Sequence, residues 1–475
     1  MRRSWSVLMC LALTVSLVAA ACGASGGSKD EGASSEFTTT AKAATTASAD
    51  FGSLKDVCGP GKDTIKAGEQ GKSDGELNIG VASDRTSSIR PGLNKDMWDA
   101  SVSFADWCNA QGGIGGLKIN PIELNAGIFE VESAMATACS DVFAMVGGGF
   151  VQDNLEFSGK DGSDFHKCKM IDLPGYAVSP EKADSNGQVQ PAPNPPSSVS
   201  NTWIRDFKQL QPEAAKKVAI AYGDLPSLVL TKDKYVAAVK DVGMDLAGTF
   251  PFPPTGLTDW TPLAQSIIES GATSLMWVGE AGQLANLLAK LREQGWKGTP
   301  LLETNMYDPL LFSVGNAAPE GSYVRMTMHP IEEASRWPAV QEYLDNLKKY
   351  VPDARTGPLG MQATSAWLLF ATAANQCSKK NDGQLDRTCI LEQAAAISDW
   401  TAGGLHAAQD PSRFDQTVAG TCSMLLKVED GKFVRAYPKI GGKGDDGDGF
   451  HCPTNGVTQV PSNAGKGKVD PSRPI

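Results

Sequence analysis

The stretch "WCNAQGGIGGLKINPIEL", residues 107–124, joins an expected helix to an expected strand. Upstream of it, apolar side chains such as Met97 and Phe104 recur at spacings of three and four, which is the pattern of one helix face. The four glycines end this helix, because glycine readily takes the positive φ that helix ends and tight turns require. The following run "KINPIEL", residues 118–124, predicts a strand.

Strands and helices alternate on both sides of this stretch. Before the proline-rich "VQPAPNPPSS" (189–198), further strands are predicted at 76–82, 143–149 and 169–175, with a helix over 131–142. After it, strands are predicted at 216–222, 245–252, 274–280 and 299–305, with helices over 228–242, 260–270 and 283–294. The chain is then mainly helical at 337–350 and 359–376, and a hairpin is predicted at 422–437. This alternation predicts an α/β fold with parallel sheets flanked by helices, and two sets predict two lobes.

The glycine-rich stretch resembles the signature N-x-x-G-G-I-x-G-x-K-I of the leucine/isoleucine/valine-binding-like substrate-binding proteins of ABC transporters. The segments "GQLANLLAKLREQGWKGTPLLETN" (282–305) and "APEGSYV" (318–324) are similar to the second lobe of that family. The resemblance covers about residues 75–440. It implies a two-lobed type I periplasmic-binding fold, each lobe a parallel sheet flanked by helices.

The resemblance also implies a hinge of three crossings between the lobes. We expect these crossings near 195–202, 326–332 and 410–420. Lobe 1 then comprises 75–198 and 329–415, and lobe 2 comprises 199–328 and 416–440. The Gly- and Pro-rich end, 441–475, is predicted to be loose.

The N-terminus has the pattern of an export signal. Arg2 and Arg3 precede an apolar run that ends at Ala21, so residues 1–21 are predicted to be a signal peptide. Residues 18–22 resemble a bacterial lipobox, in which Cys22 becomes the lipidated first residue; an ordinary cleavage site beside a chance cysteine is the alternative. The Gly-, Ser-, Ala- and Thr-rich segment that follows predicts a flexible tether, so residues 22–74 are expected to be lipid anchor and tether. The protein is therefore expected to be exported and lipid-anchored to the outer face of the cell membrane, or to face a periplasm.

Eight cysteines remain after Cys10 and Cys22 are set aside, and an even number in an exported protein predicts disulfides rather than buried free thiols. Eight cysteines allow 105 pairings. Short enclosed loops favour three pairs, and elimination supplies the fourth: Cys377–Cys389, Cys139–Cys168, Cys422–Cys452 and Cys58–Cys108.

The composition argues against several functions. The net charge of −11 is unsuited to a nucleic-acid partner, which needs clustered Lys and Arg. The four histidines lie far apart in the sequence. The G-x-S-x-G matches at 23–27 and 71–75 do not follow a strand, as a hydrolase nucleophile must. We therefore expect no catalytic residue, no metal and no cofactor, and we expect that the protein is not an enzyme.

Ligands of open parallel sheets bind beyond the carboxyl ends of the strands. Some of the candidate ligand contacts have a purely structural alternative. In that alternative, Asp84–Thr86 are a plain N-terminal segment of a helix, Phe150 is a core residue, and Tyr176 is a cap on its lobe. Ser227 stands where the family often has a ligand-stacking tyrosine. The resemblance further implies a carboxylate near Asn305 for the ammonium group of an amino acid, where Glu303 is the neighbour. The candidate ligand contacts are Asp84, Arg85, Thr86, Gly149, Phe150, Gln152 and Tyr176 in lobe 1, and Ser227, Glu280 and Asn305 in lobe 2.

These features together predict a receptor outside the cytoplasm that captures a small polar solute, such as an amino acid, an amide or a related compound. Its expected partners are that solute and the permease of an ABC importer, and it is expected to be monomeric. Two other classes stay open. One is a sensor of the same fold that signals to a membrane partner, and the other is a secreted hydrolase.

Overall fold

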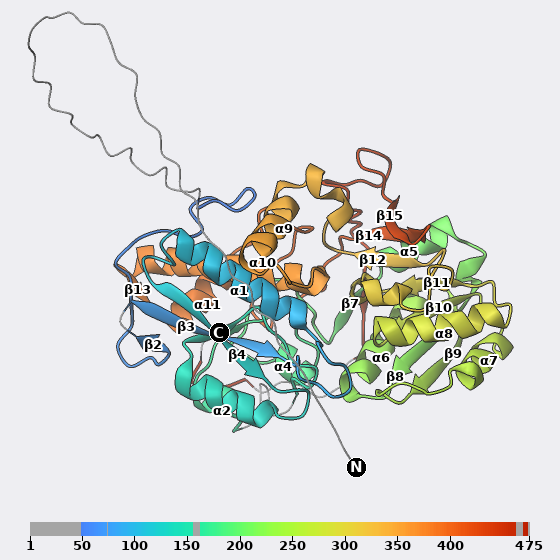
Figure 1. Cartoon of the computed structure of the whole chain (residues 1–475), viewed down its shortest axis with the longest axis horizontal. Coiled ribbons are helices and arrows are strands. Elements are labelled where there is room, and N and C mark those ends of the chain that lie inside the picture. Colours follow the sequence, from blue (N-terminus) through green and yellow to red (C-terminus); the bar gives the residue numbers. More distant parts are fainter. Residues whose placement is uncertain (1–48, 74, 155–161, 462–468, 474–475) are drawn as a thin grey trace, which may run out of the picture. The chain divides into compact units, whose positions relative to one another are not determined.

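Two parallel sheets form the centres of two lobes in the computed structural model, which describes residues 49–73, 75–154, 162–461 and 469–473 (Figure 1). The predicted signal peptide and Cys22 lie outside the described residues. The predicted α/β fold with two lobes is confirmed.

The sheet of lobe 1 has the strand order β4-β3-β5-β6, with all neighbours parallel. Alternate residues of β3 point to opposite faces, so Leu77 and Ile79 pack into one apolar core while Ala82 packs into another. Helices α1 and α10 share the first core, and α2 covers the second. The bounds are β3 Glu76–Ser83, β4 Lys118–Asn125, β5 Ala144–Val146, β6 Asp172–Leu173, α1 Lys95–Ala110, α2 Val131–Asp141, α3 Asp164–Lys167, α4 Pro180–Ala183, α9 Pro338–Tyr350, α10 Pro358–Lys380 and α11 Arg387–Ala395, with β2 (Lys72–Ser73) antiparallel to β3.

The glycine-rich turn after α1 holds the N-terminal segment against lobe 1. All four of its glycines have positive φ. A Cβ on Gly116 would lie 2.3 Å from the carbonyl oxygen of Gly61, so only glycine allows the two backbones to meet. Backbone hydrogen bonds join the segments, including Gly59 N–H to Gly113 O at 2.7 Å and Asp63 N–H to Gly115 O at 2.9 Å.

The sheet of lobe 2 has the order β9-β8-β10-β11-β12-β14-β15. Its first five strands are parallel, and the β14–β15 hairpin closes one edge antiparallel. Figure 1 shows α8 over this sheet beside β10 and β11. The bounds are β8 Lys217–Gly223, β9 Asp245–Phe252, β10 Ser274–Val278, β11 Thr299–Leu302, β12 Tyr323–Met326, β14 Met424–Glu429, β15 Lys432–Tyr437, α5 Thr202–Leu210, α6 Pro226–Asp241, α7 Thr261–Glu269 and α8 Ala281–Glu293.

The chain passes between the lobes at three places. It leaves lobe 1 through β7 (Ser198–Ser200), which directly precedes α5. It returns between β12 and α9, through the short helix η4 (Ile331–Arg336). It crosses again between α11 and β14, so segments from all three passages lie near one another where the lobes join.

The part of the predicted tether that the structure describes is packed onto lobe 1, so the predicted tether of 22–74 is wrong from residue 49 onward. Phe51 and Val57 are buried, and β1 (Thr64–Ile65) pairs in parallel with β13 (Gln384–Leu385). The Cys58–Cys108 disulfide fixes the segment further. A disulfide and backbone pairing therefore order a segment that is poor in apolar residues.

The predicted loose tail is also wrong for its described residues. Strand β16 (Val457–Gln459) pairs antiparallel with β7 at the hinge. Farther on, the guanidinium of Arg473 donates to the carbonyl oxygen of Met170 in lobe 1. All four predicted disulfide pairs are confirmed: Cys58–Cys108, Cys139–Cys168, Cys377–Cys389 and Cys422–Cys452.

Candidate functional site

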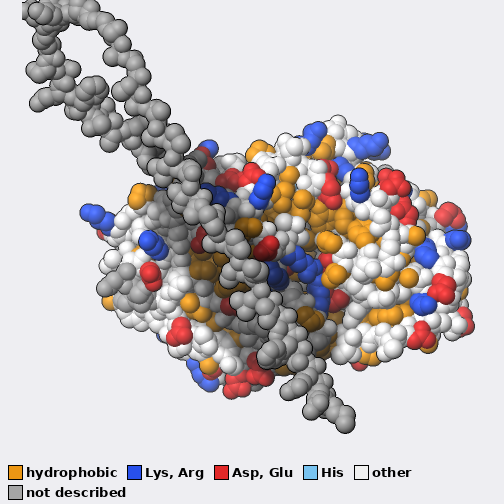
Figure 2. All heavy atoms as spheres, in the orientation of Figure 1, with side chains coloured by type: hydrophobic (Ala, Val, Ile, Leu, Met, Phe, Trp, Pro, Cys, Tyr) orange, Lys and Arg blue, Asp and Glu red, His pale blue; other side chains and the backbone are white. Residues whose placement is uncertain are grey.

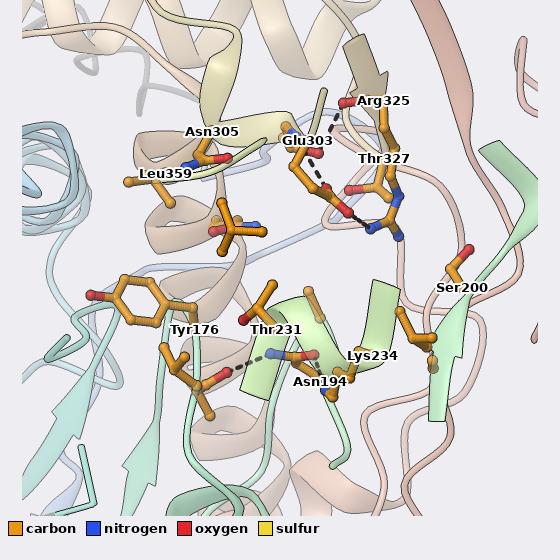
Figure 3. A pocket seen from close by; sticks show the side chains of 18 of the residues that line it. Tyr176, Asn194, Ser200, Thr231, Lys234, Glu303, Asn305, Arg325, Thr327 and Leu359 are labelled. Carbon is orange, nitrogen blue, oxygen red and sulfur yellow. Dashed lines mark hydrogen bonds and ion pairs between the residues drawn. The ribbon is translucent and has the colours of Figure 1, made fainter. Parts of the chain in front are cut away.

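A cavity of about 330 Å³ lies where the lobes and the crossing segments meet; we call it the inner chamber. Figure 3 shows Glu303, Arg325 and Thr327 on the opposite side of this chamber from Asn194 and Lys234. Its volume is at the small end of the ~300–1,000 Å³ that is usual for ligand pockets. Its lining includes Tyr176, Val178, Asn194, Ser200, Leu228, Thr231, Lys234, Trp277, Glu280, Glu303, Asn305, Arg325, Leu359 and Gln362.

A second cavity of about 180 Å³, the outer chamber, continues the cleft. It shares Tyr176, Glu280 and Asn305 with the inner chamber, so the two form one cleft that both lobes line. Its other walls include Arg90, Asn94, Asp96, Ser227, Tyr307, Asp308 and Arg355.

The ends of the parallel strands of lobe 2 supply one wall of the inner chamber. Glu303 follows β11, and its Oε1 accepts from Arg325 Nη1 of β12 at 2.8 Å. Asn305 lies beyond β11, where its Nδ2 donates to the carbonyl oxygen of Gly279 at 3.1 Å. Because the Glu303 carboxylate is paired with an arginine, the expectation that it holds the ammonium group of an amino acid is not supported by the geometry.

Lys234 of α6 is the buried cation of the opposite wall. Its side chain is 4% exposed, and its Nζ donates to Asn194 Oδ1 at 2.9 Å and to Pro195 O at 2.7 Å. Burial lowers the pKa of Lys234 to about 7, while the carboxylates of Asp184 and Glu303 act in the opposite direction. These two hydrogen bonds hold the ammonium group of Lys234 against the start of the first crossing segment.

Tyr176 lies between the two chambers. Its hydroxyl oxygen accepts from Asn94 Nδ2 at 2.7 Å, and Gly149 lies against its ring so closely that a Cβ there would be 2.7 Å from a ring atom. Burial raises the pKa of Tyr176 well above its ordinary value, and the carboxylate of Asp84 adds to the effect. The hydroxyl therefore stays protonated and offers a hydrogen-bond donor.

Four residues form an ion-pair cluster across the outer chamber; we call it the cross-cleft cluster. Arg90 and Arg355 come from lobe 1, and Glu280 and Asp308 come from lobe 2. Arg90 pairs with Glu280 and, at 3.1 Å, with Asp308, and Arg355 also pairs with Asp308. Each pair links one lobe to the other. In the space-filling view, Lys and Arg side chains gather near the middle of the face shown, with acidic side chains nearby (Figure 2).

Asp96 lies beside this cluster at the start of α1. Burial raises the pKa of Asp96 to about 6, and the positive charges of Arg355 and Arg90 reduce the shift. Its side chain is 5% exposed and lines the outer chamber.

Four of the ten predicted contact residues line the cleft: Tyr176, Ser227, Glu280 and Asn305. The remaining six, Asp84, Arg85, Thr86, Gly149, Phe150 and Gln152, are not among the residues that line either chamber.

Asp84 and Phe150 have structural positions instead. The buried carboxylate of Asp84 accepts from the backbone N–H of Ile128 at 2.6 Å and of Val151 at 2.7 Å, which ties two loops together. Phe150 is fully buried in the core next to α2, so the expectation that it packs on a ligand is wrong.

The other residues of these loops bond within lobe 1. Arg85 pairs with Glu123 on β4, with its Nε 2.8 Å from the carboxylate. Thr86 donates to Asn125 Oδ1 at 3.1 Å. Gln152 Nε2 donates to the carbonyl oxygen of Ile128 at 3.3 Å. These side chains organise the strand ends and do not face the cleft.

Sequence reasoning missed Lys234 and Arg325. Lys234 belongs to the stripe 227, 231, 234 and 238, whose spacing marks the inward face of α6. Arg325 interrupts an otherwise apolar strand between Val324 and Met326. In both cases the available signal was a charged residue at an inward position, because burying a charge costs free energy unless the charge is paired and hydrogen-bonded.

Several lining residues also carry buried polar atoms without a hydrogen-bond partner among the residues that the structure describes. These atoms are Ser200 Oγ, Trp277 Nε1, Arg325 Nε and Gln362 Oε1. Most buried polar groups in proteins are hydrogen-bonded. The walls of the inner chamber therefore have unused hydrogen-bonding capacity.

A serine–histidine pair elsewhere bears on the hydrolase alternative. Ser365 Oγ lies 2.7 Å from His406 Nε2, but both side chains are buried and neither lines the two chambers. Ser365 Oγ also accepts from Trp400 Nε1 at 2.9 Å. These contacts give the pair a structural place between α10 and the third crossing segment.

The described part of the chain contains no group of three or more His, Cys, Asp or Glu placed to hold a metal ion. Within the same residues, no helix has both the length and the apolar character to cross a membrane.

Comparisons with known proteins agree with this architecture. A family profile described as periplasmic binding protein matches residues 76–432. The chain therefore belongs to the periplasmic binding protein family, an extracytoplasmic family, and the resemblance drawn from the glycine-rich stretch is confirmed. No curated protein matches the sequence.

Several solved structures share the fold. A fatty acid ABC transporter substrate-binding protein from Thermomonospora curvata has a TM-score of 0.62 and 15% identity over 79% of this chain and 94% of that chain. A leucine-binding protein from Thermotoga maritima has a TM-score of 0.60 and 14% identity over 76% and 97%. A Rhodopseudomonas palustris solute-binding protein in complex with 4-hydroxybenzoate has a TM-score of 0.57 and 15% identity over 77% and 96%.

Proposed function

We propose that this protein is an extracytoplasmic receptor that captures one small solute in the cleft between its lobes and delivers it to an ABC importer. The observation that carries the proposal is the inner chamber. It is lined by both lobes and by the crossing segments, so a bound solute contacts every part that moves when the lobes close.

The chemistry of the chamber supports the binding of a small solute. Its walls combine apolar side chains such as Leu228 and Leu359 with the polar groups of Asn305 and Lys234, which is the usual composition of a ligand pocket. The solute classes of the solved relatives, which include leucine and 4-hydroxybenzoate, are comparable in size to such a chamber.

We further propose that Cys22 is lipidated and that the protein works as a monomer attached to the outer face of the cell membrane. The lipobox pattern and the export signal support this proposal. An anchored receptor stays close to its permease, which raises the effective concentration of the two partners.

The proposed function is tested by filling the inner chamber. A thermal-shift screen with small metabolites should find a stabilising compound, because a ligand at 100 times its Kd stabilises the folded state by ~2.7 kcal/mol. Thr231→Trp places a large ring in the chamber and should abolish the shift.

Lys240→Trp is the matched control, since Lys240 is an exposed residue of the same helix. It should leave the shift unchanged. Full binding by Thr231→Trp would refute the assignment of the site.

A further inference from the structure

Among the residues that the structure describes, the inner chamber has no unpaired carboxylate for a positively charged ligand. The charged residues in its lining are Lys234, Glu280, Glu303 and Arg325. Glu303 is paired with Arg325 at 2.8 Å, and Glu280 is paired with Arg90 of the outer chamber. Both carboxylates are thus neutralised by arginines, and a ligand ammonium group would have to displace one of them.

Lys234 differs from these carboxylates because its charge is not paired within the part of the chain that the structure describes. Its Nζ donates to two uncharged oxygens, those of Asn194 and Pro195, and it forms no ion pair with a described residue. An ammonium group has three N–H donors, so one is unused. Because the other charges cancel in pairs, a protonated Lys234 gives the inner chamber one excess positive charge.

A buried charge is costly unless an opposite charge accompanies it. A ligand carboxylate beside Lys234 supplies that charge and accepts the remaining N–H. Elsewhere in the lining, the side chains of Val178, Leu228 and Leu359 are apolar and suit the rest of such a molecule.

We propose that the inner chamber selects small solutes that carry one carboxylate and no ammonium group, with Lys234 receiving the carboxylate. The inference rests on the proposed function, because it names the solute class of the same cleft. It excludes free α-amino acids as preferred ligands, since their ammonium group would face paired carboxylates and an uncompensated lysine.

Binding of such an anion is coupled to protonation of Lys234. The groups acting on this lysine are the carboxylates of Asp184 and Glu303, which favour its charged form, and burial, which lowers its pKa to about 7. An anion beside Nζ raises that pKa. Binding should therefore take up protons at pH 8, where more of the free lysine is deprotonated, and fewer protons at pH 6.

The test begins with matched trios that differ only in the charged group. Thermal shifts are measured for benzoate, benzamide and benzylamine, for isovalerate, isovaleramide and isopentylamine, and for a metabolite library sorted by net charge, with leucine and phenylalanine among its zwitterions. The largest shifts should come from monocarboxylates. Calorimetry of the best carboxylate in two buffers of different ionisation enthalpy then measures proton uptake in the unmodified protein.

Lys234→Met should weaken binding of that carboxylate at least tenfold, but should change the affinity of its amide analogue less than threefold. Lys240→Met, an exposed lysine on the same helix, is the control and should change neither. The proton-uptake measurement needs no variant, so the inference stays testable if Lys234→Met fails to fold.

The outcomes separate the two proposals. Preferred binding of amines, amides or zwitterions, or the absence of proton uptake at pH 8, would overturn the inference and leave the proposed function standing. If no compound of the library stabilises the protein, the proposed function itself is contradicted and the inference fails with it.

Discussion

Removing one carboxylate of the cross-cleft cluster should weaken closure of the lobes. Asp308 accepts from Arg90 and Arg355, which both belong to the other lobe, and its side chain is 10% exposed. Asp308→Asn is the chosen change, because Asp308 Oδ1 also accepts from the backbone N–H of Leu310 at 2.8 Å and an asparagine oxygen keeps that bond. The variant therefore removes charge and retains the local turn.

The magnitude follows from the two charged hydrogen bonds. Such bonds contribute about 1.5–3 kcal/mol each, and both end on Oδ2, which asparagine replaces with a donor nitrogen. Arg90 keeps its pair with Glu280 and Arg355 is partly exposed, which limits the net loss. A net loss of about 2 kcal/mol from the closed state corresponds to an approximately 30-fold shift of the open–closed equilibrium. Because a ligand leaves through the open state, its dissociation rate should rise by about the same factor.

Stopped-flow fluorescence measures this rate, with Trp277 in the chamber wall as the intrinsic reporter. Small-angle scattering of the ligand-free protein should also show a larger radius of gyration for the variant. Asp245→Asn is the control, since Asp245 is an exposed carboxylate at the start of β9. A dissociation rate within twofold of the parent protein would refute a closing role for the cluster.

Three further predictions concern the anchor, the disulfides and acid stability. Cys22→Ala should move the exported protein from the detergent phase to the aqueous phase in phase partitioning, and unchanged partitioning would contradict the lipobox. Under denaturing, non-reducing conditions the mature domain should show no alkylatable thiol among its eight disulfide cysteines, and two or more labelled cysteines would contradict the four bridges. Burial lowers the pKa of His406 to about 4, below the ordinary 6.5, so between these values the unfolded state binds a proton that the folded state does not. The free energy of unfolding is therefore unaffected by His406 above pH 6.5 and falls by up to about 1.4 kcal/mol per pH unit as the pH falls toward 4. Urea unfolding of His406→Gln should show a free energy of unfolding that depends less on pH between 4 and 6.5. The same pH dependence as in the parent protein would contradict the prediction.

The secondary structure was largely predictable from local pattern. The predicted strand at 245–252 coincides with β9, and the helix expected at 131–142 corresponds to α2. The strand predicted at 143–149 is shorter, because Gly147 has a φ of 74° and turns the chain where a Cβ would lie 2.7 Å from the Trp367 ring. Apolar periodicity indicates which segments are buried, but it does not show where a neighbouring element ends a strand.

The site was predictable only in part. Ser227 and Asn305 follow parallel strands and line the cleft, as the general rule for such sheets predicts. Asp84 also follows a parallel strand, but its carboxylate points into the lobe and accepts from the backbone N–H groups of two loops. These N–H groups lie about 44 and 67 residues away in the chain, so local sequence does not reveal them. Lys234 was missed because a lysine on a helix is ordinarily solvated, and only its inward register distinguishes it.

The ordered conformation of the segments near the two chain ends was the least predictable feature of the fold. Segments 49–65 and 441–461 have few apolar residues, and composition alone predicts that they are loose. In the structure they are fixed by Cys58–Cys108 and Cys422–Cys452 and by pairing of β1 and β16 with strands from elsewhere in the chain. Cross-links and backbone hydrogen bonds add to the burial of a few apolar residues such as Phe51 and Val57.

The attachment of residues 49–65 has a mechanical consequence for an anchored receptor. The Cys58–Cys108 disulfide and the β1–β13 pairing connect this segment to lobe 1. In the proposed anchored receptor, tension on a lipid at Cys22 would therefore be transmitted through the disulfide into α1 of lobe 1 and not directly into the hinge. Lobe 1 would then be the lobe held at the membrane, and lobe 2 the lobe that moves as the cleft opens and closes.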